Sequence, residues 1–244
     1  MEILKIDRLD STNNYAKTLI SQGKAKNAQV IYAVLQTEGR GHASTVWESK
    51  KGKNLTFSLI IQPKNIEPKH QFLISQTVSV GIVNYLKHLA KNEKIHIKWP
   101  NDIYVGMKKI AGILIENTIQ NNQISFSVIG IGLNVNQTDF SEKAGCPTSL
   151  SLINKTQYNL DFELEQLATD IVNMLNNLQF DTDKACQTRY LEHLLFFNED
   201  REYIVREEKI TGKIIGVNEF GFLQIQTKNG AILECDLKEV VYIF

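Results

Sequence analysis

The sequence is poor in cysteine and proline, with 3 Cys and 4 Pro among 244 residues, and neither sign of charge is in excess. Cys146, Cys186 and Cys235 are odd in number and far apart, so they predict neither a disulfide framework nor a zinc site. Unpaired thiols of this kind are typical of a reduced cytosol. Lys plus Arg and Asp plus Glu both total 27, which gives a formal net charge of +0. No overall field therefore attracts nucleic acid or an anionic membrane.

Long apolar runs are also absent. None approaches the roughly 20 residues needed to cross a bilayer, and the charged start from Met1 to Asp7 lacks the apolar core of a signal peptide. We therefore expect a cytoplasmic protein that does not associate with membranes. Hydrophobic residues at 43% and charged residues at 22% are ordinary for a globular chain. The length fits one large domain, or one medium domain with a small module.

Apolar periodicity predicts an α+β body followed by a small β-rich module. Strands are expected over 4–9, 29–36, 52–62 and 123–136, and helices over about 68–89, 161–178 and 182–196. The capping residues Asp10 to Asn13 predict a further helix before Tyr15. From Glu202 onward, short strands separated by turn signals predict a small β-barrel. We place the body at 1–198 and the barrel at 199–244.

The segment 97–117 predicts a β-hairpin, because two apolar runs flank the turn at Gly106. Pro100 leaves Asn101 and Asp102 as a polar pair at the mouth of the first strand, and Lys109 begins the second. One interpretation is a solvated surface hairpin whose turn collects these residue types for backbone reasons. The other is a site for an anionic ligand with a metal.

Two glycine-containing segments carry further signals. Arg40 lies between Gly39 and Gly41, and glycines beside an arginine allow close approach to phosphate and closure over a ligand. The alternative is a plain mobile connection, and the segment is neither a Walker A nor a Rossmann motif. No helix follows the Gly130 and Gly132 pair, so it predicts close backbone approach within a strand.

Five motifs occur in an order that resembles biotin protein ligases, also called biotin-[acetyl-CoA-carboxylase] ligases. They are Ser11-Thr12-Asn13, Gln36 with Gly39-Arg40-Gly41 and Trp47, Lys98-Trp99-Pro100-Asn101-Asp102, Lys109 to Glu116, and Gly130 to Asn136. The resemblance covers the whole chain. It implies a catalytic domain with a mixed sheet, like class II aminoacyl-tRNA synthetases, and an SH3-like C-terminal β-barrel.

The resemblance also implies a two-step activity that uses ATP and Mg²⁺. The biotin carboxylate attacks the α-phosphorus to give biotinyl-5′-AMP and pyrophosphate. A lysine of a biotin carboxyl carrier protein then takes the biotinyl group and AMP leaves.

Roles for individual residues follow from the resemblance and from the chemistry, because an anion attacking an anion needs cations at the developing charge. The catalytic candidates are Arg40, Asp102 and Lys109. Biotin contacts are expected from Ser11, Thr12, Asn13, Gln36, Arg40, Gly41, His42, Lys109 and Gly112. Contacts with ATP or the adenylate are expected from Arg40, Trp47, Asn101, Lys109 and Asn134. Mg²⁺ is expected through the ATP phosphates. Asp102 either binds it or assists deprotonation of the incoming lysine.

The chain departs from the family pattern in two places. Many relatives continue with further arginines after Gly41, whereas His42-Ala43-Ser44-Thr45 follows here. This loop therefore carries less positive charge to retain the adenylate. Our hypothesis is that biotinyl-adenylate is released faster here than in the arginine-rich relatives, and it fails if His42→Arg leaves adenylate dissociation unchanged. About ten residues precede Ser11. We therefore expect no DNA-reading domain and no repressor activity. A homodimer through edge-strand pairing stays open.

Three alternatives compete with a monofunctional biotin ligase. A lipoate or octanoate ligase would typically carry an Arg-Arg-x-Ser-Gly-Gly-Gly stretch, which is missing from the sequence. A biotin sensor without catalysis would be expected to lose Arg40, Asp102 or Lys109, and all three are present. An interaction module built on the C-terminal barrel leaves the larger body unexplained.

Overall fold

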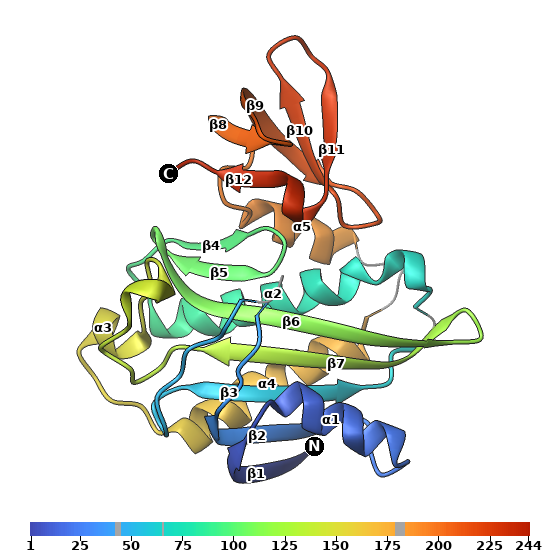
Figure 1. Cartoon of the computed structure of the whole chain (residues 1–244), viewed down its shortest axis with the longest axis vertical. Coiled ribbons are helices and arrows are strands. Elements are labelled where there is room, and N and C mark those ends of the chain that lie inside the picture. Colours follow the sequence, from blue (N-terminus) through green and yellow to red (C-terminus); the bar gives the residue numbers. More distant parts are fainter. Residues whose placement is uncertain (42–44, 65, 179–183) are drawn as a thin grey trace.

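The computed structural model describes residues 1–41, 45–64, 66–178 and 184–244, which form two β-sheets (Figure 1). The larger sheet has seven strands in the order β1-β2-β3-β7-β6-β5-β4. Its strands are β1 (Glu2–Leu9), β2 (Gln29–Gln36), β3 (Leu55–Ile61), β4 (Ile95–Lys98), β5 (Asp102–Val105), β6 (Lys108–Gln120) and β7 (Gln123–Leu133). β1 and β2 are parallel and the other pairs antiparallel, so the predicted mixed sheet is confirmed.

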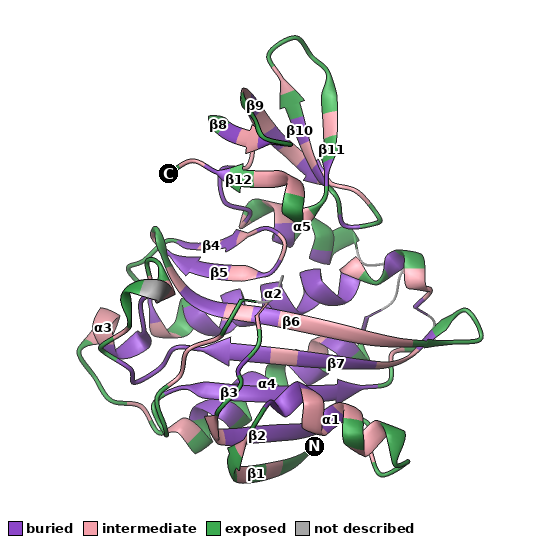
Figure 2. Ribbon diagram, in the orientation of Figure 1, coloured by how far each residue is buried: buried purple, intermediate pink, exposed green. Residues whose placement is uncertain are grey.

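Helices cover both faces of this sheet. On one face lies α1 (Thr12–Ser21), where Ala16 packs on Ile31, Ile60 and Val128. On the other lie α2 (Phe72–Leu89) and α4 (Leu160–Asn176), which also pack on each other. Two shorter helices are α3 (Leu150–Asn154) and α5 (Lys184–Glu192). Neighbouring residues of a strand point to opposite faces of the sheet. Since helices cover both faces, the central strands are buried along most of their length (Figure 2).

The predicted hairpin is confirmed as β5 and β6, and the strand predicted over 29–36 coincides with β2. Several boundaries were wrong by a few residues, among them the ends of the last predicted helix and of β7. The last helix ends at Glu192 rather than near 196, because the following backbone pairs with Ile97 of β4: Ile97 N donates to His193 O and Leu195 N to Ile97 O. β7 ends at Leu133, so Asn134 and Asn136 lie beyond the strand.

The second sheet has five antiparallel strands in the order β11-β10-β9-β8-β12. They are β8 (Asp200–Val205), β9 (Glu208–Val217), β10 (Leu223–Thr227), β11 (Ile232–Cys235) and β12 (Val240–Tyr242). In the part of the chain that the structure describes, no ladder joins the edge strands β11 and β12, so no closed barrel is found. The SH3-like barrel and the division at 198 and 199 stay predictions.

None of the helices within the described ranges has both the length and the apolar character required to span a bilayer.

Candidate active site

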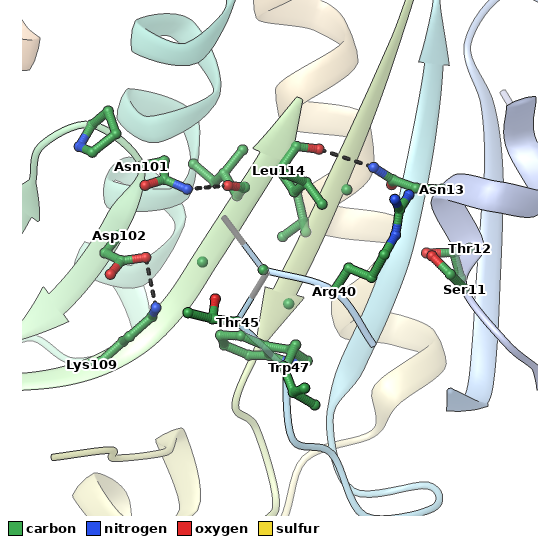
Figure 3. A pocket seen from close by; sticks show the side chains of 18 of the residues that line it. Ser11, Thr12, Asn13, Arg40, Thr45, Trp47, Asn101, Asp102, Lys109 and Leu114 are labelled. Atoms are coloured by element: carbon green, nitrogen blue, oxygen red, sulfur yellow. Dashed lines mark hydrogen bonds and ion pairs between the residues drawn. The ribbon is translucent and has the colours of Figure 1, made fainter. Parts of the chain in front are cut away.

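A cavity of about 340 Å³ lies on the α1 face of the large sheet, a volume in the usual range for small-ligand sites. Most of the predicted site residues line it: Ser11, Thr12, Asn13, Gln36, Arg40, Gly41, Trp47, Asn101, Asp102, Lys109 and Gly112. Figure 3 shows Asp102 and Lys109 on one side and Ser11, Thr12 and Asn13 on the other, with Trp47 between them. The fold therefore brings together residues that are up to 101 positions apart in the chain.

Small residues on neighbouring strands make the floor of this cavity. Gly132 of β7 is paired with Gly112 of β6, and Gly130 of β7 with Ser58 of β3. A Cβ atom on Gly132 would lie 2.6 Å from Cζ2 of Trp47, and one on Gly130 would lie 3.0 Å from Cγ of Asn13. The predicted close approach at this glycine pair is thus confirmed, although side chains approach rather than backbone.

One end of the cavity holds a cluster of amides and hydroxyls at the start of α1. Thr12 donates from its backbone N to Gln36 Oε1 at 2.8 Å. The Ser58 hydroxyl lies 2.7 Å from Thr12 Oγ1 and 2.6 Å from Asn13 Oδ1. Ser11 is the N-cap residue, but its side chain makes no capping hydrogen bond, so the predicted capping role is wrong for this side chain. Ser11, Thr12, Asn13 and Ser58 are buried and Gln36 is half-buried, and the contacts above fix the cluster.

Arg40 enters the cavity next to this cluster and is paired with Glu116 of β6, with Nη2 3.0 Å from Oε2. Glu116 also receives hydrogen bonds from Lys17 and Asn13, both at 2.8 Å. Burial opposes ionisation of Glu116, but these hydrogen bonds and the Arg40 charge outweigh it and hold the pKa of the carboxyl below its usual value. Two cations thus share one carboxylate, a pairing that the sequence motifs did not predict.

The opposite end holds Lys109, whose Nζ lies 2.7 Å from Asp102 Oδ1 and 5.6 Å from the centre of the Trp47 ring. Both side chains of the ion pair are about one quarter to one third exposed, with 31% for Lys109 and 23% for Asp102. Asn101 donates from Nδ2 to Ile113 O, which ties the turn before β5 to β6. A cation and a carboxylate therefore face the cavity from adjacent strands.

Several residues that line the cavity were not predicted: Lys98, Gly130, Gly132, Leu237 and Lys238. The last two lie in a short 3-10 helix (Leu237–Glu239) between β11 and β12, and nothing in the sequence indicated that this C-terminal module reaches the cavity. Asn134 was predicted but does not line it; its Nδ2 donates to Thr148 O at 3.0 Å. His42 lies outside the described residues.

The residues near the cavity offer little to a metal ion. Within the described ranges, no group of three or more His, Cys, Asp or Glu side chains is placed to hold one. Asp102 is the one carboxylate in the described lining, and it is already paired with Lys109. Mg²⁺ keeps several waters and is commonly held by one carboxylate with substrate phosphates. The lining fits that mode and does not fit an all-protein metal site.

The comparisons with known proteins agree with one another. The model described as Biotin/lipoate A/B protein ligase family matches residues 6–134. The chain is 36% identical over 148 residues to the Bifunctional ligase/repressor BirA of Bacillus subtilis, covering 59% of this chain and 45% of that protein. It is 27% identical over 227 residues to the protein of the same name from Bacillus spizizenii, covering 92% and 69%.

Among solved structures, the chain resembles biotin protein ligase from Aquifex aeolicus in complex with biotin and ATP. The TM-score is 0.78 at 27% identity, and the match covers 98% of this chain and 97% of that one. The chain thus spans nearly the whole of the Aquifex protein but about half the length of the Bacillus subtilis relative.

Proposed function

The chain belongs to the biotin/lipoate A/B protein ligase family, and we propose that it is an ATP-dependent biotin protein ligase. In this proposal it activates biotin as biotinyl-5′-AMP and transfers the biotinyl group to a lysine of a biotin carboxyl carrier protein. One observation carries the proposal. A single cavity has fixed amides and hydroxyls at one end and a lysine with a carboxylate at the other.

Biotin binding is assigned to the amide and hydroxyl cluster. Ser11, Thr12, Asn13 and Gln36 supply donors and acceptors of the kind that a cyclic urea requires. Because the contacts between Thr12, Gln36 and Ser58 hold these groups before ligand binds, little ordering is left to be lost on binding. A carboxylic acid without a polar ring would make no hydrogen bonds with these groups, which favours biotin over lipoate or octanoate.

The first step needs positive charge where the carboxylate meets the α-phosphate. The carboxylate oxygen bonds to the phosphorus, the bond to the β-phosphate oxygen breaks, and that oxygen leaves with the electron pair as pyrophosphate. Lys109 is assigned to this point because its side chain lines the cavity beside Gly112, which has no side chain of its own. Arg40 contributes once phosphate competes with Glu116 for its guanidinium.

Adenylate binding is assigned to Trp47 and Asn101 with Arg40 and Lys109. The Trp47 ring lies over the glycine floor, and a planar base can stack on such a ring. Asn134 stays a prediction, since it does not line the cavity. When bound, Mg²⁺ would lower the negative charge of the phosphates, and Asp102 is the residue that would share in holding it.

In the second step the acceptor lysine attacks the carbonyl of the mixed anhydride, and AMP leaves with the electron pair of the broken bond. The amine must first lose a proton. We assign Asp102 to accept it, because Asp102 is the one carboxylate in the described lining of the cavity, and this role and the metal role both stay open.

Several finer points belong to the same proposal. We assign a catalytic domain to 1–198 and an SH3-like domain to 199–244, and we expect a cytoplasmic location. The formal net charge of +0 supports ligation without sequence-specific DNA binding. A mobility-shift assay that detected operator binding by the pure protein would contradict that restriction. Monomer and homodimer both stay compatible with the proposal.

The test is ATP–pyrophosphate exchange by the purified protein with biotin, lipoate, octanoate or no acid. We expect exchange with biotin alone. Exchange with lipoate or octanoate would instead identify a lipoate or octanoate ligase of the same family. No exchange with any acid, together with tight biotin binding, would identify a sensor instead.

A further inference from the structure

Lys98 is a cation in the cavity wall for which the steps above have no use. It ends β4 and lies opposite Asp102 of β5, which in turn lies opposite Gly112 of β6. One row of residues therefore runs from the cavity floor to Lys98 across three strands. Since neighbouring strands are about 4.8 Å apart, Lys98 lies further along the wall than the point assigned to the α-phosphate.

The charges around Lys98 are not balanced. Its half-buried side chain lines the cavity, and no carboxylate in the described residues lies within the 4.0 Å limit of an ion pair with it. The nearby Asp102 is 2.7 Å from Lys109 instead. Burial lowers the pKa of Lys98, while Asp102 raises it and Lys109 lowers it. Two lysines and one carboxylate leave a net positive charge that an anionic ligand would neutralise.

Three aromatic rings surround the Lys98 ammonium. Its Nζ lies 5.1 Å from the ring centre of Tyr242, 5.6 Å from that of Phe244 and 5.9 Å from that of Tyr104. The Phe244 ring stacks on Tyr104 at 6.3 Å and on Tyr242 at 6.4 Å. Ring faces attract an ammonium without neutralising its charge. The rings therefore orient Lys98 and leave it free to bind an anion.

One of these rings belongs to the second sheet, since Tyr242 ends β12, and Phe244 follows this strand. Other contacts hold this sheet against the same wall: Trp99 Nε1 donates to Gly221 O at 2.9 Å, and Leu237 and Lys238 line the cavity. The second sheet is thus part of the wall where Lys98 lies.

We propose that Lys98 binds the β- and γ-phosphates of ATP and the pyrophosphate that leaves, and that Tyr242 and Phe244 are positioning residues for its ammonium. The inference rests on the proposed function. Lys109 binds the α-phosphate and the biotin carboxylate. Lys98 lies further along the row that contains Gly112 and Asp102, and it binds the β- and γ-phosphates. The second sheet thereby supports the adenylation step.

The test compares Lys98→Met and Lys98→Arg with Lys91→Met, a control at an exposed lysine before β4. One charge-assisted hydrogen bond to phosphate corresponds to roughly 10- to 100-fold in binding. We expect Lys98→Met to raise the KM for ATP and the inhibition constant of pyrophosphate by that factor. Inhibition by AMP, biotin binding and transfer from preformed biotinyl-AMP should be unchanged. Lys98→Arg should retain most of the ATP affinity.

The positioning role is tested with Phe244→Leu, which keeps an apolar side chain at a position that is 65% exposed and removes the ring face. Phe162→Leu, at a 57% exposed phenylalanine of α4, is the matched control. Loss of one ring contact should raise the KM for ATP about 2- to 5-fold, and the control should not change it. This variant decides the matter if Lys98→Met does not fold.

An unchanged KM for ATP in folded Lys98→Met or in Phe244→Leu would overturn the inference. So would a loss of equal size in AMP inhibition and in transfer from preformed adenylate, because that pattern indicates a structural role. Wild-type protein without biotin-dependent exchange would instead reject the proposed function.

Discussion

The two glycines of β7 allow the same substitution to be made at two points on the cavity floor, with different expected results. Gly130→Ala places a methyl group 3.0 Å from Cγ of Asn13, which is 3% exposed. Gly132→Ala places one 2.6 Å from Cζ2 of Trp47, which is half-buried. At each position either the methyl group or the neighbouring side chain must move.

The magnitudes follow from what each neighbour can do. Asn13 is held by hydrogen bonds to Ser58, Leu114 and Glu116, so moving it breaks buried contacts. Overpacking and lost hydrogen bonds together should lower the free energy of unfolding by about 2 to 4 kcal/mol. Trp47 lies outside the helices and strands and is only half-buried, so we expect its ring to shift and Gly132→Ala to cost only about 1 kcal/mol. It should instead weaken ATP binding, since stacking of a base on an aromatic ring is worth about 1 to 3 kcal/mol.

Urea unfolding and thermal melting measure the first effect, and at this chain length we expect Gly130→Ala to lower Tm by about 5 to 15 °C. Calorimetric titration with biotin and with ATP measures the second. Gly216→Ala of β9 is the control, because its methyl group meets one flexible side-chain atom of Gln224 at 3.1 Å. Asn13 would not be fixed as described if both β7 variants lost the same stability. The same would follow if Gly130→Ala were as stable as the wild-type protein.

Three further predictions concern charged and buried groups. Lys109→Met should slow adenylate formation by about 10²-fold or more, measured by pyrophosphate exchange, because a cation directed at phosphate is removed. Glu116→Gln should remove part of the loss of stability that wild type shows in acid. Burial raises the pKa of Glu116, but its hydrogen-bonding and charged partners hold the pKa below its usual value. The ionised carboxylate therefore stabilises the fold at neutral pH, and this stabilisation is lost as pH falls through the folded pKa. Since the Glu116 side chain is 29% exposed and paired with Arg40 and Lys17, the difference from wild type in urea unfolding should be at most about 1 kcal/mol. Tyr85→Phe should lower the free energy of unfolding by about 1 to 3 kcal/mol, because the Tyr85 hydroxyl donates to Glu163 between α2 and α4 and that carboxylate would lose its buried partner.

Local patterns were enough to predict most elements of the large sheet. β2 is predicted from end to end because its β-branched and apolar residues are bounded by polar ones, and the hairpin of β5 and β6 is predicted because a turn separates two apolar runs. The end of α5 could not be predicted. Its stripe continues to Phe196, but Ile97 competes for the backbone from His193 onward, and that pairing spans almost a hundred residues.

Most of the predicted site residues line one cavity, because each motif contains the polar or glycine residue on which the prediction rests, but their mutual arrangement could not be predicted. Glu116 appeared only as the last residue of a motif, and its pairing with Arg40 and Lys17 depends on how α1 and the loop lie over β6. The sequence indicates no role for Lys98 beyond its place in a motif, because the rings that surround its ammonium come from positions 104, 242 and 244. These arrangements depend on contacts between segments that are far apart in the chain, and local patterns in a single sequence do not predict such contacts.

The net charge of the whole chain differs from the charge that lines the cavity. The whole chain has a formal net charge of +0, which predicts no general attraction for polyanions. Yet in the described lining of the cavity, four cations, Arg40, Lys98, Lys109 and Lys238, face one carboxylate, Asp102. Coulomb interactions are stronger where less water competes, so this local excess acts on a small ligand while the balanced exterior does not. A neutral protein with a cationic cavity suits a substrate whose negative charge is concentrated within a few ångströms, as it is in a triphosphate, and this supports assigning Lys98 to the phosphates that Lys109 does not reach.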